Sequence, residues 1–471
     1  MRLTSLDERI AASSAALRDI YPLWLHGWVA SVSGLAVEVA GLAGHLSIGD
    51  RLALRARDGS EIPAEIVGFR GGLAQAMAFG ALDGLGPGSI ARAQGIATGR
   101  PANWRNEGAE SGVRGGGRLA VGDAWLGRVL DPLGRPLDGL GRPGAGVPRP
   151  VRIGPPPATA RARLGERLDF GVCALNCFTT CRRGQRLGLF AGSGVGKSTL
   201  LAMLAKRTEC DVAVLALVGE RGREVREFLE DELGADGLAR SVVIVATSDA
   251  PPLMRREAAY AAMSVAEHFR DQGKSVLLLM DSVTRFCLAL REIGLSAGEP
   301  PATRGYPPSV FAELPRLLER AGPGPQGRPG TPAGFITALF TVLVEGDDHN
   351  EPVADAVRGI LDGHVVLDRR IAEGGRYPAV DVLRSLSRSM PGCNSTAEGA
   401  TIADARAVLS LYAEMADLIR LGAWKPGADP AVDRAVALAP RIEAVLRQGR
   451  DETSPFADGF ARLAEALHTP G

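Results

Sequence analysis

The 471-residue sequence has no long hydrophobic run. Its longest apolar stretches, residues 212–218, 242–246 and 276–280, are far too short to cross a lipid bilayer. The N-terminal residues include early acidic side chains and no apolar central segment, so they lack the pattern of a secretory signal. From these absences we expect a soluble, cytosolic protein.

The sequence also has no excess of charge of either sign and few cysteines. Its 54 basic residues balance 54 acidic ones, which argues against a protein whose main task is to grip nucleic acid. Cys173, Cys177 and Cys181 are spaced by four residues, whereas zinc sites usually have shorter gaps and need a fourth ligand. No histidine lies near them, so reduced thiols on a helix are favoured over a metal site.

The most informative motif that is present occupies residues 187–200, LGLFAGSGVGKSTL. An apolar run, a glycine-rich turn and a stretch with helical spacing form the strand–loop–helix context of a phosphate-binding loop. The glycines let backbone N–H groups converge on phosphate oxygens, while Lys197 reaches the β- and γ-phosphates and the Ser198 hydroxyl ligates Mg²⁺. Ala191 replaces the usual first glycine, which is a mild change if it ends the strand and the turn begins at Gly192. The predicted nucleotide-binding residues are Gly192, Ser193, Gly194, Val195, Gly196, Lys197, Ser198 and Thr199.

Two acidic residues reduce the number of reactions that fit this loop, because each ends an apolar strand downstream of it. Asp281 ends the run SVLLLMD, the usual place of a carboxylate that helps to hold Mg²⁺ through water. Glu220 follows the run VAVLALV. If its strand lies beside that of the loop, its carboxylate lies over the γ-phosphate and polarises a water for in-line attack. Phosphoryl transfer also needs positive charge, for which Arg221, Arg376 and Arg388 are candidates that composition does not rank.

The pattern along the chain indicates four segments. Residues 1–21 are expected to form a short amphipathic helix, which would either pack on its own body or dock a partner helix. Residues 22–95 contain short strands separated by glycine turns and predict a small β-barrel or sandwich. Strands and helices alternate in residues 96–390, which predicts an α/β domain with a mostly parallel sheet and ligands at the carboxyl ends of its strands. Residues 391–471 read as helical, with helices over 402–419 and 431–448. The expected sheet strands are 186–190, 212–218, 242–246, 276–280 and 335–344, and the expected helices between them include 222–233, 258–272 and 283–293.

Two connecting segments are rich in glycine or proline. Residues 101–118 are polar and predict a connector. Residues 322–334, GPGPQGRPGTPAG, have no apolar anchor and predict a solvated, mobile loop.

Long motifs then point to a known family. The motifs occur in the order GERGREV, LLLMDSVTRF, PPATRGYPPSVFAELPRLLERAG, TVLVEGDDHNEPVADAVRGILDGHVVLDRRIA and GRYPAVDVLRSLSR. With them the sequence resembles the catalytic-subunit superfamily of rotary ATP synthases, and within it the type III export ATPases, the flagellar members above all. The match covers nearly the whole chain, including the barrel pattern VEVAG, IGDR, AEIVGF and the LGRVLDPLGRPLDG entry to the central domain. It implies a RecA-like P-loop NTPase core. In the hexamer that the resemblance implies, the Pro/Gly loop after Gly322 is expected to face the pore.

Matched position by position, the resemblance implies roles for individual residues. Lys197 and Ser198 fall on phosphate and Mg²⁺, Glu220 on the catalytic base and Asp281 near the metal. Arg221, beside the base, is a further catalytic candidate.

Three other residues fall at family positions around the nucleotide. Arg388, in SLSR, falls where the family places an arginine finger that reaches the neighbouring subunit's nucleotide. Tyr377, in GRYPAVD, falls where an aromatic ring stacks on adenine, although an aromatic packed under a proline turn is the alternative. The aromatic that covers the other adenine face in ATP synthase has no clear match, and Arg450 lies near its position.

The resemblance implies a cytosolic ATPase that hydrolyses ATP with Mg²⁺ at the subunit interfaces of a homohexamer and energises flagellar protein export. The implied partners are a stator-like regulator on the N-terminal helix, a central stalk protein, export chaperone–substrate complexes and, at the cytoplasmic face of the inner membrane, the export gate. Nucleic acid is not among them.

Alternatives from the same and from other classes stay open. They are the ATPase of a virulence injectisome, a catalytic subunit of a rotary ATP synthase and a hexameric RNA translocase. Glu220 argues against the superfamily's non-catalytic subunits, in which this glutamate is replaced. Residues 22–92 are poor in lysine and the charge of the chain is balanced. Both argue against the translocase, which would carry a basic, aromatic-bearing oligonucleotide-binding domain.

Overall fold

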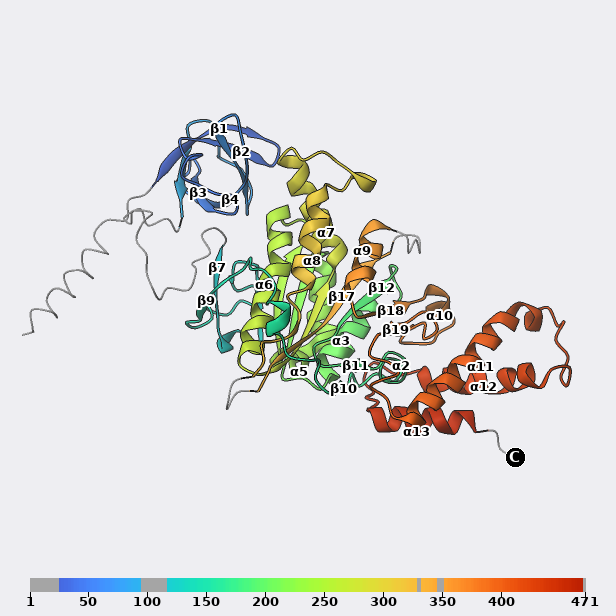
Figure 1. Ribbon diagram of the computed structural model, residues 1–471. Helices are drawn as coiled ribbons and strands as arrows, with labels where there is room; N and C mark the ends of the chain where they lie inside the picture. The colour runs from blue at the N-terminus through green and yellow to red at the C-terminus, as the bar shows by residue number, and fades with distance from the viewer. Residues whose placement is uncertain (1–24, 95–116, 328–331, 345–350, 469–471) are drawn as a thin grey trace, which may run out of the picture. The chain divides into compact units, whose positions relative to one another are not determined.

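The computed structural model describes residues 25–94, 117–327, 332–344 and 351–468 (Figure 1). The chain divides into two compact units, of which the first contains a β-barrel and the second contains a large sheet with the C-terminal helices. The helix expected over residues 1–21 and most of the connector 101–118 lie outside the described residues. No helix in the described part of the chain has the length and apolar character needed to span a membrane.

The first unit confirms the small β-barrel, which closes in the strand order β1-β2-β5-β4-β3-β6. Alternate residues along each strand point inward, so that Val37 and Val39 of β2 are fully buried in the barrel core. The strand over 90–93, which the sequence pattern did not predict, pairs with β1 and β3 and thereby closes the barrel. The strands are β1 His26–Ser33, β2 Ala36–Ala40, β3 Arg51–Arg55, β4 Glu61–Arg70, β5 Leu73–Ala78 and β6 Ile90–Ala93.

The second unit is built on a sheet in the order β19-β18-β12-β17-β15-β13-β14-β8, with β16 paired to β17. Neighbours from β18 to β8 run parallel, and β19 and β16 are antiparallel, so the mostly parallel sheet is confirmed. The strands are β8 Arg128–Leu130, β12 Arg186–Ala191, β13 Val212–Glu220, β14 Ser241–Thr247, β15 Ser275–Asp281, β16 Gly322–Pro323, β17 Phe335–Leu343, β18 Gly363–Leu367 and β19 Leu386–Ser387. Outside this sheet lie β7 Arg118–Val121, β9 Val147–Pro150, β10 Arg167–Leu168 and β11 Cys181–Arg182.

The strand order corrects one premise of the sequence analysis. The strand that ends in Glu220, β13, does not lie beside the loop strand β12, because β17 and β15 lie between them. Asp281, at the end of β15, is likewise one strand removed from β12. The crossovers set this order, since β12 and β13 follow each other along the chain but are far apart in the sheet.

Both faces of the sheet are buried, which explains why its strands read as continuous apolar runs. Side chains alternate between the faces along each strand. In β15, Leu277 and Leu279 belong to one core, whereas Val276, Leu278 and Met280 belong to the other.

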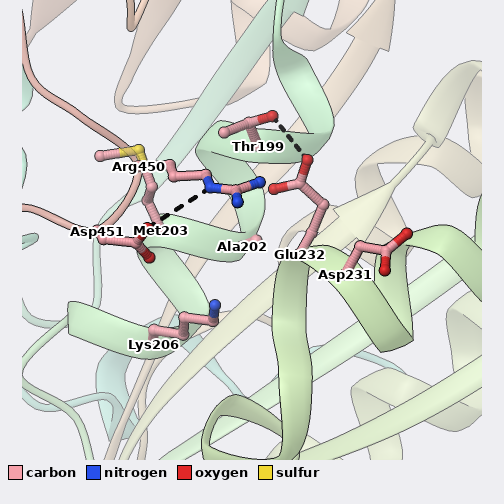
Figure 2. Close-up of a pocket in the computed structure, with 8 residues that line it drawn as sticks. All are labelled: Thr199, Ala202, Met203, Lys206, Asp231, Glu232, Arg450 and Asp451. Carbon is pink, nitrogen blue, oxygen red and sulfur yellow. Dashed lines mark hydrogen bonds and ion pairs between the residues drawn. The ribbon is translucent and has the colours of Figure 1, made fainter.

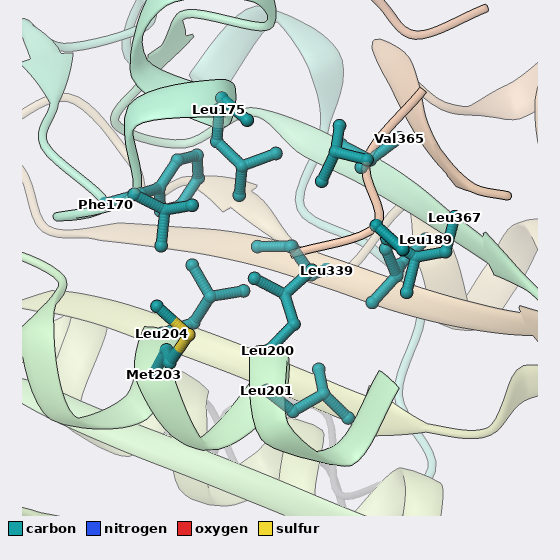
Figure 3. Close-up of a cluster of buried hydrophobic side chains, with 14 of the residues drawn as sticks. Phe170, Leu175, Leu189, Leu200, Leu201, Met203, Leu204, Leu339, Val365 and Leu367 are labelled. Carbon is teal, nitrogen blue, oxygen red and sulfur yellow. The ribbon is translucent and has the colours of Figure 1, made fainter. Parts of the chain in front are cut away.

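The helix that follows the phosphate-binding loop is held by the first of these cores. Figure 3 shows Leu200, Leu201, Met203 and Leu204 of this helix in one buried cluster with Leu339 of the sheet. All five are at most 3% exposed. The beginning of the helix is therefore fixed relative to the carboxyl ends of the strands.

The helices largely follow the predicted periodicity, with two differences. The segment over 222–233 is a short α-helix followed by a π-helix, η3 Phe228–Leu233. The C-terminal part has a third helix, α13, which the pattern did not predict. The helices are α2 Cys173–Phe178, α3 Lys197–Arg207, α4 Gly222–Glu227, α5 Gly234–Ala239, α6 Pro252–Asp271, α7 Val283–Ser296, α8 Pro308–Leu318, α9 Pro352–Ile360, α10 Arg369–Glu373, α11 Thr396–Arg420, α12 Pro430–Leu446 and α13 Phe456–Leu467, and short 3₁₀ turns are η1 Asp123–Trp125, η2 Ala158–Ala160 and η4 Thr303–Gly305.

A close approach explains why α13 escapes the sequence pattern. Gly459 lies inside this helix and weakens the helical signal. A β-carbon at this position would lie 3.2 Å from Cys177 Sγ and 3.5 Å from Cys173 Sγ, so glycine lets α13 approach α2. Both thiols are free and buried on α2, but Cys181 lies on β11, so the expectation that all three are on a helix was wrong.

The start of the Pro/Gly segment 322–334 also differs from the expected solvated loop. Its first two residues form β16, which pairs with β17, and residues 322–324 are buried. Residues 328–331 lie outside the described part, and the proposed pore-facing role stays a prediction.

Candidate nucleotide-binding and catalytic site

The phosphate-binding loop lies between β12 and α3. Ala191 is the last residue of β12 and is 1% exposed, so its methyl group is part of the sheet core and the turn begins at Gly192. Gly194 and Gly196 have φ angles of 76° and 83°, a left-handed conformation that favours glycine. The loop then delivers Lys197 as the first residue of α3, where free backbone N–H groups and the helix dipole favour anions.

Lys197 brings together the two acidic residues singled out in the sequence. Its Nζ atom lies 2.5 Å from Asp281 Oδ1 and 3.4 Å from Glu220 Oε1. Thr341, on the intervening strand β17, donates its hydroxyl to Asp281 Oδ1 at 2.7 Å. The length of the lysine side chain therefore compensates for the two strands between β12 and β13. The sequence pattern missed Thr341, whose one signal is a hydroxyl inside the apolar run FITALFTVL.

The charges of this cluster shift the pKa values of its members. Burial raises the pKa of Glu220, and the nearby Asp281 raises it further against the opposing effects of Lys197 and Arg285. Burial lowers the pKa of Lys197, but Asp281 and Glu220 more than offset it, so that the pKa is raised overall. Lys197 is therefore a cation and Glu220 binds a proton more readily than an exposed glutamate, which suits a general base.

The backbone before Glu220 is adapted to a close contact. Gly219 has a φ of 71°, and a β-carbon there would lie 3.0 Å from Cβ of Arg285 on α7. The Glu220 side chain is 15% exposed, so it is poorly solvated but not fully enclosed.

Ser198 and Asp281 offer the oxygen ligands that Mg²⁺ prefers. Ser198 is exposed in the first turn of α3, and Asp281 Oδ2 has no hydrogen bond within the described part of the chain. In that part, no three His, Cys, Asp or Glu side chains gather to hold a metal ion by themselves. The donor set fits an ion whose remaining ligands are water and phosphate oxygens.

The three candidate arginines have different surroundings. Arg376 is 5% exposed and donates to the carbonyls of Pro378 and Val380, so it is a structural residue. Arg221 is exposed and pairs with Glu224 at 3.2 Å, so the structure does not bring its guanidinium to Lys197. Arg388 is exposed, and its guanidinium has no partner among the residues that the structure describes.

Tyr377 and Thr199 lie close to the loop. The Tyr377 ring lies against the loop, because a β-carbon on Gly196 would be 3.2 Å from two of its carbons. Thr199 donates its hydroxyl to Glu232 Oε1 at 3.1 Å (Figure 2). Glu232 lies in the π-helix η3, and such helices are frequent at functional sites. The sequence pattern, which predicted an ordinary helix there, missed Glu232.

Models of protein families match three successive parts of the chain. Residues 29–95 match the beta-barrel domain of the ATP synthase alpha/beta family, and residues 171–387 match the nucleotide-binding domain of that family. Residues 395–465 match the T3SS EscN ATPase C-terminal domain.

Whole proteins are similar over nearly the full length. The chain is 54% identical to the flagellum-specific ATP synthase of Caulobacter vibrioides, over 97% of this chain and 98% of the relative. It is 44% identical to the type 3 secretion system ATPase of Xanthomonas euvesicatoria, over 98% and 96%. The solved structure of the assembled ATPase EscN from enteropathogenic E. coli covers 94% of this chain and 100% of that chain, with a TM-score of 0.81 and 37% identity. EscN in complex with its central stalk EscO gives a TM-score of 0.80 and 36% identity over 94% and 100%.

Fold and site together define a P-loop ATPase with a RecA-like core. The chain belongs to the ATP synthase alpha/beta family, in the branch of flagellum-specific ATP synthases and type 3 secretion ATPases. The resemblance seen in the sequence motifs is thereby confirmed.

The raised pKa of Glu220 predicts a pH-dependent effect on stability. Below the ordinary value of 4.5, Glu220 is protonated in both the folded and the unfolded chain. Above it the unfolded chain releases the proton first, so the folded state loses stability as the pH rises through the folded-state pKa. The variant Glu220→Gln should therefore melt at a higher temperature than the wild type at pH 8, with the difference shrinking towards pH 4.5.

Calorimetric melting at several pH values checks this expectation. Glu224→Gln, at an exposed neighbour, is the matched control and should show no comparable pH-dependent gain. A Glu220→Gln protein that melts below the wild type at pH 8 would show that pairing with Lys197 outweighs the burial of the carboxylate.

Proposed function

We propose that the protein hydrolyses ATP at the subunit interfaces of a homohexamer and thereby energises export through the flagellar type III secretion apparatus. The observation that carries the hydrolase assignment is the meeting of Lys197, Glu220 and Asp281 at the carboxyl ends of the strands. The flagellar assignment is supported by 54% identity to a flagellum-specific ATP synthase over nearly the whole chain. The domain limits 1–21, 22–95, 96–390 and 391–471 are part of the proposal.

The residues of the site divide the chemistry between them. Backbone N–H groups of residues 192–198 and the Lys197 ammonium bind the phosphate oxygens. Glu220 orients a water for in-line attack on the γ-phosphorus and accepts its proton, for which a raised pKa is favourable. Ser198 and Asp281 would hold Mg²⁺, which when bound neutralises charge on the phosphates.

The positive charge that completes the site comes from a neighbouring subunit in this proposal. Arg388 is exposed and has no partner in the described part of its own chain, as expected for an arginine that acts across an interface. Arg221 is exposed beside the base and is the second catalytic candidate. Tyr377 contacts the loop through Gly196 and stacks on the adenine.

The proposed partners follow from the family. The assembled EscN structure and its complex with the central stalk EscO support a hexamer that contacts a stalk protein. The proposal also includes a stator-like regulator at residues 1–21, export chaperone–substrate complexes and a peripheral contact with the membrane export gate. The protein then works in the cytoplasm, at the cytoplasmic face of the inner membrane.

A second candidate is the ATPase of a non-flagellar type III secretion system. It is favoured by the match of residues 395–465 to the EscN C-terminal domain and by 44% identity to the Xanthomonas protein. Deletion of the gene followed by a motility assay separates the two. Loss of swimming that the wild-type gene restores supports the flagellar role, and unchanged swimming contradicts it.

The variant Glu220→Gln should bind ATP with unchanged affinity and hydrolyse it about 10²–10⁴-fold more slowly, because the amide does not accept a proton. Steady-state ATPase assays and ATP titration measure the two effects. In cells, this variant should also fail to restore swimming to the deletion strain. Retained hydrolysis would exclude Glu220 as the base, whereas lost hydrolysis with normal swimming would exclude ATP turnover as the energy source for export.

The variant Arg388→Ala should lose turnover by about 10³-fold or more while the protein still assembles, because the transferred phosphoryl group loses a compensating charge. The defect should be rescued in trans. A Lys197→Ala subunit has an inactive site of its own but offers an intact Arg388 to its neighbour. Activity should therefore reappear when the two variants are mixed, in assays at several mixing ratios. An absence of rescue at every ratio would contradict the interface role of Arg388.

A further inference from the structure

The backbone of Arg388 lies at the opposite end of the sheet from the phosphate-binding loop of its own chain. Its N–H donates to the carbonyl of Asp362 at 2.9 Å, and Asp362 directly precedes β18. β18 runs parallel to β12, whose first residue is Arg186 and whose last residue, Ala191, precedes the loop. The six residues of β12 span roughly 17–20 Å, which is more than an arginine side chain can reach. The loop and Arg388 of one chain therefore belong to different sites.

The Asp362 carboxylate ties the position of Arg388 to the beginning of β12. Its Oδ2 atom accepts the backbone N–H of Arg186 at 3.0 Å and the Nε–H of the same residue at 3.1 Å, and its Oδ1 atom accepts from Nη2 at 3.2 Å. The backbone N–H of Asp362 donates to the Arg186 carbonyl at 2.8 Å. A carboxylate held by both the backbone and the forked guanidinium of one residue has a fixed orientation. The carbonyl that accepts from Arg388 is thereby fixed relative to the strand that carries the loop.

The residue before Arg388 is buried, whereas the arginine side chain is exposed. Ser387, 1% exposed, donates its hydroxyl to the carbonyl of Thr180 at 2.8 Å. Gly363 allows β18 to approach it, because a β-carbon there would lie 3.0 Å from Cα of Ser387. The Arg388 guanidinium has no partner in the part of the chain that the structure describes. The structure thus combines a fixed backbone with an exposed cation.

We propose that Asp362 is a positioning residue for the arginine finger, because its contacts with Arg186 fix the point from which Arg388 extends into the neighbouring subunit's site. This inference rests on the proposed function, in which Arg388 acts across the interface. A charged group stabilises a transition state best when it is already held in place, and a misplacement of about 1 Å can cost about 10²-fold in rate. Since Arg186 begins the strand that ends at the loop, β12 connects the finger of one site with the phosphate-binding loop of the next.

The variant Asp362→Ala should lower kcat about 10- to 100-fold while the KM for ATP changes less than about twofold, because the phosphate-binding loop is intact. Steady-state ATPase assays over a range of ATP concentrations measure both. Thermal melting and gel filtration check folding and assembly. Asp362→Asn keeps the size of the side chain and one acceptor for the Arg186 N–H, and it replaces Asp362→Ala in every assay if that variant does not fold.

Glu319 offers a matched control on the same arginine. Its carboxylate pairs with the Arg186 guanidinium at 2.6 Å, but the carbonyl that accepts from Arg388 belongs to Asp362. Glu319→Gln removes a charge of the same sign from the same guanidinium, so its kcat should stay within about twofold of the wild type.

Mixed assemblies show where the defect acts. An Asp362→Ala subunit keeps its own loop, so a Lys197→Ala subunit, which offers an intact finger, should restore activity to it. Mixing with Arg388→Ala should restore none, because both variants then lack a working finger. In the double variant Asp362→Ala/Arg388→Ala, kcat should fall less than about twofold below that of Arg388→Ala, since a positioning residue has no effect once its finger is gone.

The outcomes separate this inference from the proposed function. An unchanged kcat of Asp362→Ala, an equal loss in Glu319→Gln, rescue of Asp362→Ala by Arg388→Ala, or a full further loss in the double variant would overturn the positioning role. Full activity of Arg388→Ala, or its failure to be rescued by Lys197→Ala, would instead overturn the interface role of Arg388 in the proposed function.

Discussion

The ion cluster of Lys197 with Asp281 and Glu220 is the interaction on which the site depends. Charges of such low exposure are stable only when they are paired, and here the three come from one helix, α3, and two strands, β13 and β15. The strand register sets the pairing, because Asp281 lies opposite Leu217 of β13 in a ladder held by buried side chains on both faces. A register slip of one residue would turn Asp281 to the other face of the sheet. The buried cores thus fix the positions of the three charged residues, and these residues determine where the phosphate groups bind.

The apolar strands of the sheet were predictable, but their order was not. Runs such as SVLLLMD end in the structure at the residue where the sequence pattern ends. The order depends on long crossovers that local periodicity does not encode, and so β17 and β15 separate Glu220 from the loop strand. The role of Glu220 remains compatible with this order because the long Lys197 side chain reaches it. The helix α13 was missed for a similar reason, since Gly459 serves a contact with α2 that is distant in sequence.

Within the site, the sequence identified the charged residues but did not rank them. Burial alone separates Arg376, whose guanidinium is bound to backbone carbonyls, from the exposed Arg388. Neutral or indirect contributors were harder to find. Thr341 and Glu232 act through hydrogen bonds to Asp281 and Thr199, and such pairings exist only in the folded chain.

Two bonds join the C-terminal helices to the nucleotide site. Arg376 pairs with Glu443 of α12 at 2.5 Å, and the N–H of Gln448 donates to the carbonyl of Tyr377. A displacement of α12 and of the segment after it that preserves both bonds would also move Tyr377, whose ring lies against the phosphate-binding loop. Coupling between two sites is reciprocal. If a partner that binds the C-terminal helices changes the affinity for nucleotide, bound nucleotide therefore changes the affinity for that partner by the same factor.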